Sequence, residues 1–255
     1  MKNPYEELML RATDLAERAS RIAFSHFRQK LLIEMKENHT PVTIADKKTE
    51  EMIRKELEVS YPEWGIIGEE LGDVTKRSDF TWTIDPIDGT RSFIRGIPLF
   101  GTLLGLLHKG EPIVGVMVLP ALDETYAAAK GCGTHCNGTQ VRVSTVKSIE
   151  SSFLAVGDTS CFEAAGKTKT LNQLLEKSDV CRGYTDCFGH SLVLRGAIDA
   201  MIDPAVSIWD VVPIACLVKE AGGVFCDFEG NESYTSSNFV SCTPGVRKDL
   251  LEVLG

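Results

Sequence analysis

The stretch WTIDPIDGTR, residues 82–91, decides the fold of this 255-residue chain. Its apolar beginning predicts a strand that ends at Asp85, because Pro86 has no amide hydrogen for further ladder pairing. Asp88, followed by Gly89 and Thr90, can then open a short helix. Two carboxylates therefore follow the carboxyl end of a strand, the position at which open α/β sheets bind ligands.

The two aspartates of this stretch predict a cation site. Asp85 and Asp88 have no reason to converge unless a cation lies between them, because unscreened like charges disfavour ionisation. The amides of Gly89 and Thr90 at the helix start favour a phosphate oxygen. Oxygen ligands, an incomplete protein cage and phosphate are what Mg²⁺ prefers. Taken alone, the stretch leaves open that Asp88 is a simple N-cap in a surface turn.

Three further acidic places strengthen the metal interpretation. Glu69 and Glu70 follow a predicted strand, Asp46 leads into a predicted helix, and Asp210 begins another. Each alone suits a solvated loop, a cap or the helix dipole. Their joint occurrence, in this order and at these spacings, favours a site.

The hydrophobic periodicity outside these motifs predicts an α/β protein. Helices are expected over residues 5–30, 45–59, 163–177, 187–197, 210–221 and 245–254. Strands are expected over residues 64–68, 80–84, 99–108, 113–119, 124–129, 141–143, 153–157, 180–184, 200–202, 224–227 and 239–242. The pattern changes from paired helices and hairpins to alternating strands and helices. We therefore expect two packed subdomains: residues 1–145, α+β and carrying most metal ligands, and residues 146–255, α/β and contributing Asp210 and the substrate contacts.

The composition limits the partners and the compartment. With 27 Lys and Arg against 36 Asp and Glu, the net charge of −9 argues against nucleic acid or an anionic membrane surface. Hydrophobic residues at 43% and charged residues at 25% are typical of a globular chain and exclude a disordered one. The first twenty residues are charged throughout and show no signal peptide, so the eight cysteines are expected to be reduced in a cytoplasmic protein.

The cysteines and histidines give weaker indications of a functional site than the acidic residues do. Cys132, His135 and Cys136 lack a fourth ligand for zinc, and the surrounding glycines favour a hairpin turn. Cys181-Arg182 lacks the phosphate-cradling loop that a cysteine phosphatase needs. The remaining histidines show no pairing that suggests a catalytic triad.

Taken together, the motifs resemble the inositol-monophosphatase-like family of lithium-sensitive, Mg²⁺-dependent phosphomonoesterases. The resemblance runs through VTIADKKTE (42–50), GEE (68–70), DPIDGT (85–90), GCGTHCNG (131–138) and WDVVPIACLVKEAGG (209–223). It implies a five-layered αβαβα sandwich, two or three Mg²⁺ ions, a small phosphate ester as substrate and a homodimer.

The resemblance also implies roles for individual residues. Glu69, Asp85 and the carbonyl of Ile87 match the ligands of a first metal. The second metal would be held by Asp85, Asp88 and Asp210. Asp46 and Thr90 match the pair that, with Glu69, orients and activates the attacking water, and Gly89 and Thr90 the phosphate contacts. This agrees with metal-assisted hydrolysis, in which the metal lowers the pKa of water and stabilises the leaving oxygen.

The substrate expectation rests on two segments. RSFIRGIPLFGTL (91–103) and Asp186 in YTDCF (184–188) resemble the histidinol-phosphatase branch of the family. This chain departs from that branch at Tyr184-Thr185, where the branch has paired glycines, and at Trp209, where it often has Tyr. Asp203 stands where inositol-type enzymes usually carry Glu.

These segments predict histidinol phosphate as substrate, contacted by Arg91, Asp186 and Asp203. The alternatives are an inositol or broader polyol phosphatase, and a metal-dependent binding or regulatory protein on the same fold. An ordinary surface ion pair between Arg91 and Asp186 also stays open at this point.

Overall fold

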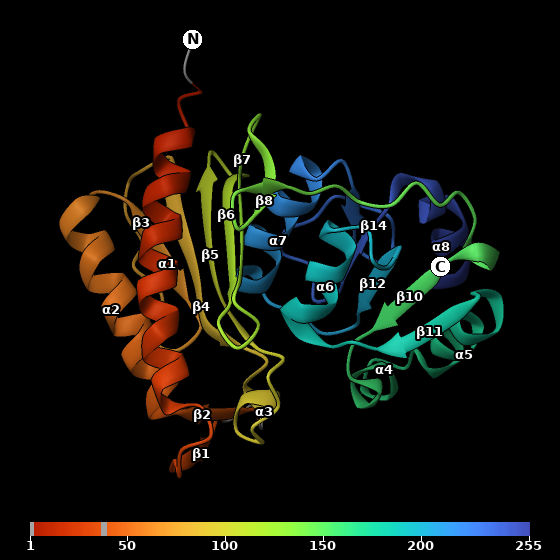
Figure 1. The fold of residues 1–255 in the computed structure, drawn as a ribbon, viewed down its shortest axis with the longest axis horizontal. Helices are drawn as coiled ribbons and strands as arrows, with labels where there is room; N and C mark the ends of the chain where they lie inside the picture. The colour runs from red at the N-terminus through yellow and green to blue at the C-terminus, as the bar shows by residue number, and fades with distance from the viewer. Residues whose placement is uncertain (1–2, 37–39) are drawn as a thin grey trace.

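Two β-sheets alternate with three layers of helices in the computed structural model, which describes residues 3–36 and 40–255 (Figure 1). The order of layers is α1 and α2, the first sheet, α6 and α7, the second sheet, and then α4, α5 and α8. This confirms the αβαβα sandwich that the sequence resemblance implied. No helix of the described ranges is long and apolar enough to cross a membrane.

The first sheet has the strand order β3-β4-β5-β6-β7-β8-β9. Its strands are β3 (Gly65–Gly68), β4 (Phe80–Asp88), β5 (Gly101–His108), β6 (Glu111–Leu119), β7 (Glu124–Ala129), β8 (Gly133–Cys136) and β9 (Thr139–Gln140). Neighbours pair antiparallel except β3 and β4, which are parallel. Helices α1 (Glu6–His26) and α2 (Ile44–Ser60) cover the outer face, where the fully buried Ala16 and Ala19 let α1 lie close to the strands.

The inner face of this sheet is covered by α7 (Ile208–Glu220), with α6 (Asp186–Leu194) beside it. A side chain at Gly115 of β6 would clash with the backbone of Pro213 in α7. Glycine at this position therefore lets α7 lie directly on the strand, and this contact fixes the start of α7, where Asp210 lies.

The second sheet has the order β11-β10-β12-β14-β13. Its strands are β10 (Phe153–Val156), β11 (Val180–Gly183), β12 (Ala200–Asp203), β13 (Val224–Cys226) and β14 (Phe239–Cys242). β10 pairs in parallel with β11 and β12, whereas β14 pairs antiparallel with β12 and β13. The apolar sides of α4 (Thr159–Ala164), α5 (Thr168–Lys177) and α8 (Arg247–Leu254) cover its outer face.

Several predicted elements are wrong in detail. β4 does not end at Asp85: its ladder with β5 skips a bulge that contains Pro86 and resumes at Asp88. Because the bulged residues make no ladder bonds, the missing amide hydrogen of Pro86 costs nothing there. The expected helix over 163–177 is two helices, α4 and α5, since Gly166 adopts a φ of +68° between them.

Three more differences concern segments near the helices. Residues 141–143 are not a strand; the amide of Val141 donates to Thr134 and that of Val143 to Ala221. The first helix ends at His26 instead of residue 30. The segment after it forms an unexpected short ladder between β1 (Ile33–Met35) and β2 (Pro41–Thr43).

Candidate active site

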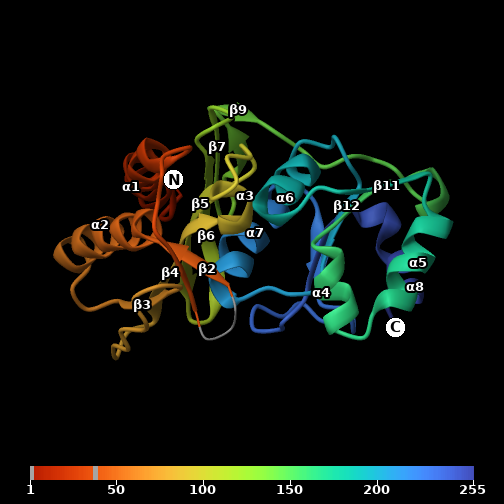
Figure 2. The ribbon, with the colours of Figure 1, turned by 90° about the horizontal axis from the view of Figure 1, so that it is seen from below.

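A cavity of about 440 Å³ lies where β4 and the short helix α3 (Thr90–Phe93) meet α6, α7 and β12. Figure 2 shows α6 and α7 between the two sheets. The cavity is lined by ten of the eleven predicted site residues: Glu69, Asp85, Ile87, Asp88, Gly89, Thr90, Arg91, Asp186, Asp203 and Asp210. The eleventh, Asp46, lies behind Thr90. The fold thus brings together residues that the sequence places far apart.

Asp85, Asp88 and Asp210 form an acidic cluster, in which one carboxylate oxygen of each lies within 4.8 Å of the others. Oδ1 of Asp85 accepts the amide of Ile87 at 3.0 Å, which holds the bulge of β4 in place. Asp88 accepts the amide of Cys187 at the start of α6. Asp210, in the first turn of α7, accepts the amide of Ser207 at 2.8 Å. Each carboxylate is therefore oriented by backbone amides before any ligand arrives.

The carboxylates of the acidic cluster are buried close to one another, so their mutual repulsion favours a bound cation. Burial, together with the charges of Glu69 and the neighbouring aspartates, raises the pKa of Asp85 well above its usual range. Burial and then the charge of Asp88 do the same for the pKa of Asp210. Burial, with the charge of Asp186 next, raises the pKa of Asp88 to about 7. A divalent cation would remove this repulsion, and an all-oxygen donor set suits Mg²⁺, so the residues present fit the implied metal.

Glu69 follows β3 as predicted, but it lies outside the acidic cluster of the described residues. Its Oε1 accepts a hydrogen bond from Lys36 Nζ at 2.7 Å, and the same ammonium donates to Glu70 at 2.6 Å. Burial and the charge of Glu69 raise the pKa of Glu70 to about 7. The ammonium of Lys36 therefore neutralises part of the negative charge of Glu69 and Glu70, beside the predicted ligands of the first metal. Sequence reasoning missed it, because no motif surrounds it and its position depends on the β1–β2 ladder.

Thr90 and Asp46 are in contact, as their expected joint role requires. The Thr90 hydroxyl lies 2.9 Å from the carbonyl oxygen of Ile87 and 3.4 Å from Oδ1 of Asp46. Oδ2 of Asp46 accepts the amide of Thr43 at 2.8 Å and its hydroxyl at 2.6 Å, in a capping box at the start of α2. Burial raises the pKa of Asp46. The hydrogen bond from the Thr90 hydroxyl uses one lone pair of the Ile87 carbonyl oxygen, and the second lone pair can bind another ligand.

Asp186 begins α6 in a strained backbone conformation, with a φ of +58°. Its side chain accepts the hydroxyl of Thr185 at 2.7 Å and lies against Gly89, where a Cβ would come within 3.2 Å of Oδ2 of Asp186. Gly89 itself has a φ of +83°, so glycine is needed there on both counts. Asp186 is thus held next to the predicted phosphate position.

Asp203 and Arg91 complete the predicted substrate residues. Asp203 ends β12 and accepts the amide of Ala205 at 3.3 Å. Burial, then the charge of Asp186, raises its pKa to about 8. Arg91 is exposed, and its charge acts on Asp186, but within the described residues the two side chains do not come close enough to form an ion pair. The alternative of a surface ion pair between these two is not observed.

The cavity also contains residues that the motifs did not indicate. Asp158 caps α4, and His190 lies within α6. Of these, His190 had a detectable signal, because it follows Asp186 by one helical turn and so shares its face.

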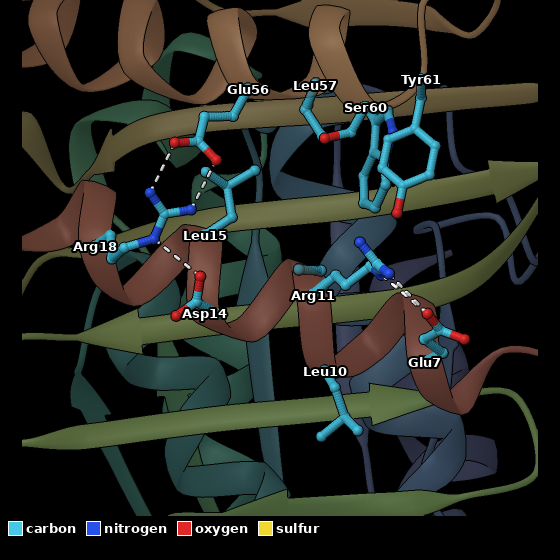
Figure 3. Close-up of a pocket in the computed structure, with 12 residues that line it drawn as sticks. Glu7, Leu10, Arg11, Asp14, Leu15, Arg18, Glu56, Leu57, Ser60 and Tyr61 are labelled. Atoms are coloured by element: carbon cyan, nitrogen blue, oxygen red, sulfur yellow. Dashed lines mark hydrogen bonds and ion pairs between the residues drawn. The ribbon is translucent and has the colours of Figure 1, made fainter.

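A second hollow, of about 360 Å³, lies between α1 and α2 on the outer layer (Figure 3). Its charged side chains are paired with one another: Arg18 bonds Asp14 and Glu56, and Arg11 bonds Glu7. It holds none of the predicted site residues. The cysteine and histidine segment at residues 132–136 contributes to β8, and all eight cysteines are free thiols.

The sequence model of the inositol monophosphatase family matches residues 5–253. The histidinol-phosphatase of Chlorobaculum parvum is 35% identical over 246 residues, which are 96% of this chain and 95% of that protein. Among solved structures, the extragenic suppressor protein suhB of Bartonella henselae has a TM-score of 0.91 at 26% identity, covering 98% of both chains. The IMPase of Thermotoga maritima has a TM-score of 0.88 at 28% identity, covering 97% of this chain and 96% of that one.

Proposed function

The chain belongs to the inositol monophosphatase family of phosphatases, and we propose that it is a Mg²⁺-dependent phosphomonoesterase that hydrolyses histidinol phosphate to histidinol and phosphate. One observation carries the proposal: Asp186 and the acidic cluster line the same cavity, with Asp186 against Gly89. Histidinol phosphate carries a phosphate and an ammonium a few bonds apart. A carboxylate beside the phosphate position suits that ammonium through a charge-assisted hydrogen bond.

In this proposal one group of residues binds the metal ions and a second group positions the phosphate and the water. Glu69, Asp85, the Ile87 carbonyl, Asp88 and Asp210 would hold two or three Mg²⁺ ions. Bound Mg²⁺ would lower the pKa of the attacking water and stabilise the leaving oxygen in an in-line displacement.

The remaining residues act on the phosphate and on the water. The amides of Gly89 and Thr90 bind the phosphate at the start of α3. The Thr90 hydroxyl, held by Asp46, orients the attacking water together with Glu69. Arg91 and Asp203 border the leaving alcohol at the edge of the same cavity.

A second substrate class is favoured by Asp203. With its pKa raised to about 8, its carboxyl is neutral at physiological pH in the ligand-free site and offers a hydrogen bond to hydroxyls in place of charge to an ammonium. An inositol or other polyol phosphate would use that group. A metal-dependent binding or regulatory protein on the same fold is the remaining alternative, and the description of suhB as an extragenic suppressor protein is compatible with it.

Phosphate release measured side by side separates these functions. The purified protein with Mg²⁺ is assayed on histidinol phosphate, inositol 1-phosphate and glycerol 2-phosphate, and kcat/KM is compared. The highest value is expected for histidinol phosphate. A higher value for inositol 1-phosphate supports the polyol alternative, and absence of turnover on all three supports a non-enzymatic role.

The family resemblance also supports a homodimer, which we propose as the solution state. Size-exclusion chromatography with light scattering tests it: the mass of two chains is expected, and the mass of one chain contradicts it.

A further inference from the structure

His190 is a buried titratable side chain that the proposed mechanism does not use. It lies in α6, is only 2% exposed, and lines the cavity that holds the acidic cluster. Its Nδ1 lies 2.8 Å from Oγ of Ser241 in β14, and its ring packs edge-on against Phe239 with centroids 5.4 Å apart. The ring is thus fixed from the side of the second sheet.

The contact with Ser241 determines which ring nitrogen carries the proton. In the described part of the chain the buried Ser241 hydroxyl has no partner except His190 Nδ1. If Nδ1 carried the proton, the hydroxyl hydrogen would be buried without an acceptor, which costs free energy. The hydroxyl therefore donates to Nδ1, and the neutral imidazole carries its proton on Nε2. Burial lowers the pKa of His190 to about 3, so the ring stays neutral at physiological pH.

The protonated Nε2 faces the cavity. The described side-chain atoms that are fully buried and lack a partner are Thr49 Oγ1, Trp82 Nε1 and Thr83 Oγ1. Nε2 of His190 is not one of these atoms, and no described residue is its hydrogen-bond partner, so Nε2 is not fully enclosed by protein. The cavity is the open space that this ring lines. A buried, oriented donor of this kind is satisfied by water or by an acceptor atom of a bound ligand, and a ligand that displaces the water is favoured if it offers such an acceptor.

The position of His190 relative to Asp186 indicates which part of a ligand it meets. The two residues are four apart in α6, so they lie on the same helix face, and both line the cavity. Asp186 lies against Gly89, at the predicted phosphate position, whereas His190 lies one turn further along α6. An ester bound by its phosphate at α3 would meet Asp186 first and His190 with its far end.

We propose that Nε2–H of His190 donates a hydrogen bond to a neutral acceptor atom at the far end of the leaving alcohol, either a ring nitrogen or a hydroxyl oxygen. This inference rests on the proposed phosphatase function and deepens it. It divides recognition of histidinol phosphate between two residues of one helix face: Asp186 binds the ammonium, and His190 binds the acceptor nitrogen of the imidazole.

The test compares histidinol phosphate with phosphoethanolamine, which keeps the phosphate and the ammonium but lacks the ring. His190→Phe keeps a planar ring and removes the donor, while His190→Gln can present an amide donor near the place of Nε2. For His190→Phe, kcat/KM on histidinol phosphate should fall about 3- to 10-fold, mainly through KM, which is the size of one neutral hydrogen bond. Turnover of phosphoethanolamine should change less than about twofold, since the contact is absent there.

Recovery of most of the loss in His190→Gln supports the donor role. An equal loss on both esters in His190→Phe, or no loss on either, overturns it. A separate readout is the long-range ¹H–¹⁵N NMR spectrum of the wild-type protein, in which His190 should show the Nε2–H tautomer; the Nδ1–H tautomer contradicts the inference. If wild type prefers inositol 1-phosphate, the substrate proposal fails by itself. The His190 inference is then judged by the same comparison between inositol 1-phosphate and phosphoethanolamine.

Discussion

Replacing Asp186 by asparagine removes one negative charge from the substrate cavity and keeps the shape of the side chain. Asparagine is the suitable substitute because it tolerates the φ of +58° better than alanine and still accepts the Thr185 hydroxyl. The variant loses a charge-assisted hydrogen bond to the substrate ammonium, which is about 1.5–3 kcal/mol. At about 1.4 kcal/mol per tenfold change, kcat/KM for histidinol phosphate should fall roughly 10- to 150-fold. Because Asp186 is only half-buried, we expect the decrease in kcat/KM to lie in the lower half of that range.

The same change should not lower the turnover of esters that carry no ammonium. The charge of Asp186 is the largest electrostatic contribution, after burial, to the raised pKa of Asp88. Its removal lets Asp88 ionise more readily and hold a cation better. For glycerol 2-phosphate, kcat/KM in Asp186→Asn should therefore stay equal to wild type or rise.

The assay measures phosphate release from both esters over a range of Mg²⁺ concentrations. Asp179→Asn is the matched control, because it removes one charge from an exposed side chain outside the cavity and should change neither ester. If Asp186→Asn lowers both esters by the same factor, the carboxylate serves the site as a whole and the reasoning about the ammonium is wrong.

Three further outcomes follow from the site. Asp88→Asn should lower kcat/KM at least about 10²-fold, since metal stabilisation contributes several kcal/mol; full activity in EDTA would contradict this. Thr90→Ala should lower kcat with little change in KM, because the hydroxyl is used mainly in the transition state, and a change in KM alone would contradict its role. In EDTA the unfolding midpoint should fall as the pH rises from about 4 to about 8 and should level off above that. The pKa values of Glu70 and Asp203 are raised from 4.5 and 3.8 to about 7 and about 8, so over this range the folded state keeps two protons that the unfolded state has lost. Differential scanning calorimetry checks this, and Asp203→Asn should flatten the upper part of the decline; a midpoint that rises over this range would refute it.

The elements around the acidic motifs follow from short stretches of sequence. Thr43 and Asp46 form a capping box, so α2 begins where the local pattern predicts it. Ser207 and Asp210 start α7 in the same way, and the apolar run before Asp85 forms β4. These features depend on contacts within a few residues, which a local pattern records. The division of the chain into subdomains near residue 145 stays a prediction.

Details that depend on distant partners were not predictable. The bulge that carries β4 past Pro86 depends on its register with β5. Lys36 reaches Glu69 because β1 and β2 pair, and Val143 is held by the end of α7 instead of by a strand. In each case a single residue has several possible partners, and packing selects one.

The sequence by itself determined which residues are capable of the chemistry, since residue type and spacing indicate a carboxylate site for Mg²⁺ and phosphate. The tertiary structure decided how those residues meet. Asp210 comes within 4.8 Å of Asp85 and Asp88 because α7 lies against β6 at Gly115, and the start of α6 donates to Asp88. It also made His190 a fixed donor at the cavity, because the tautomer is set by Ser241 on another element. Chemical capability belongs to each side chain, whereas distance, burial and protonation arise only when separate elements pack together.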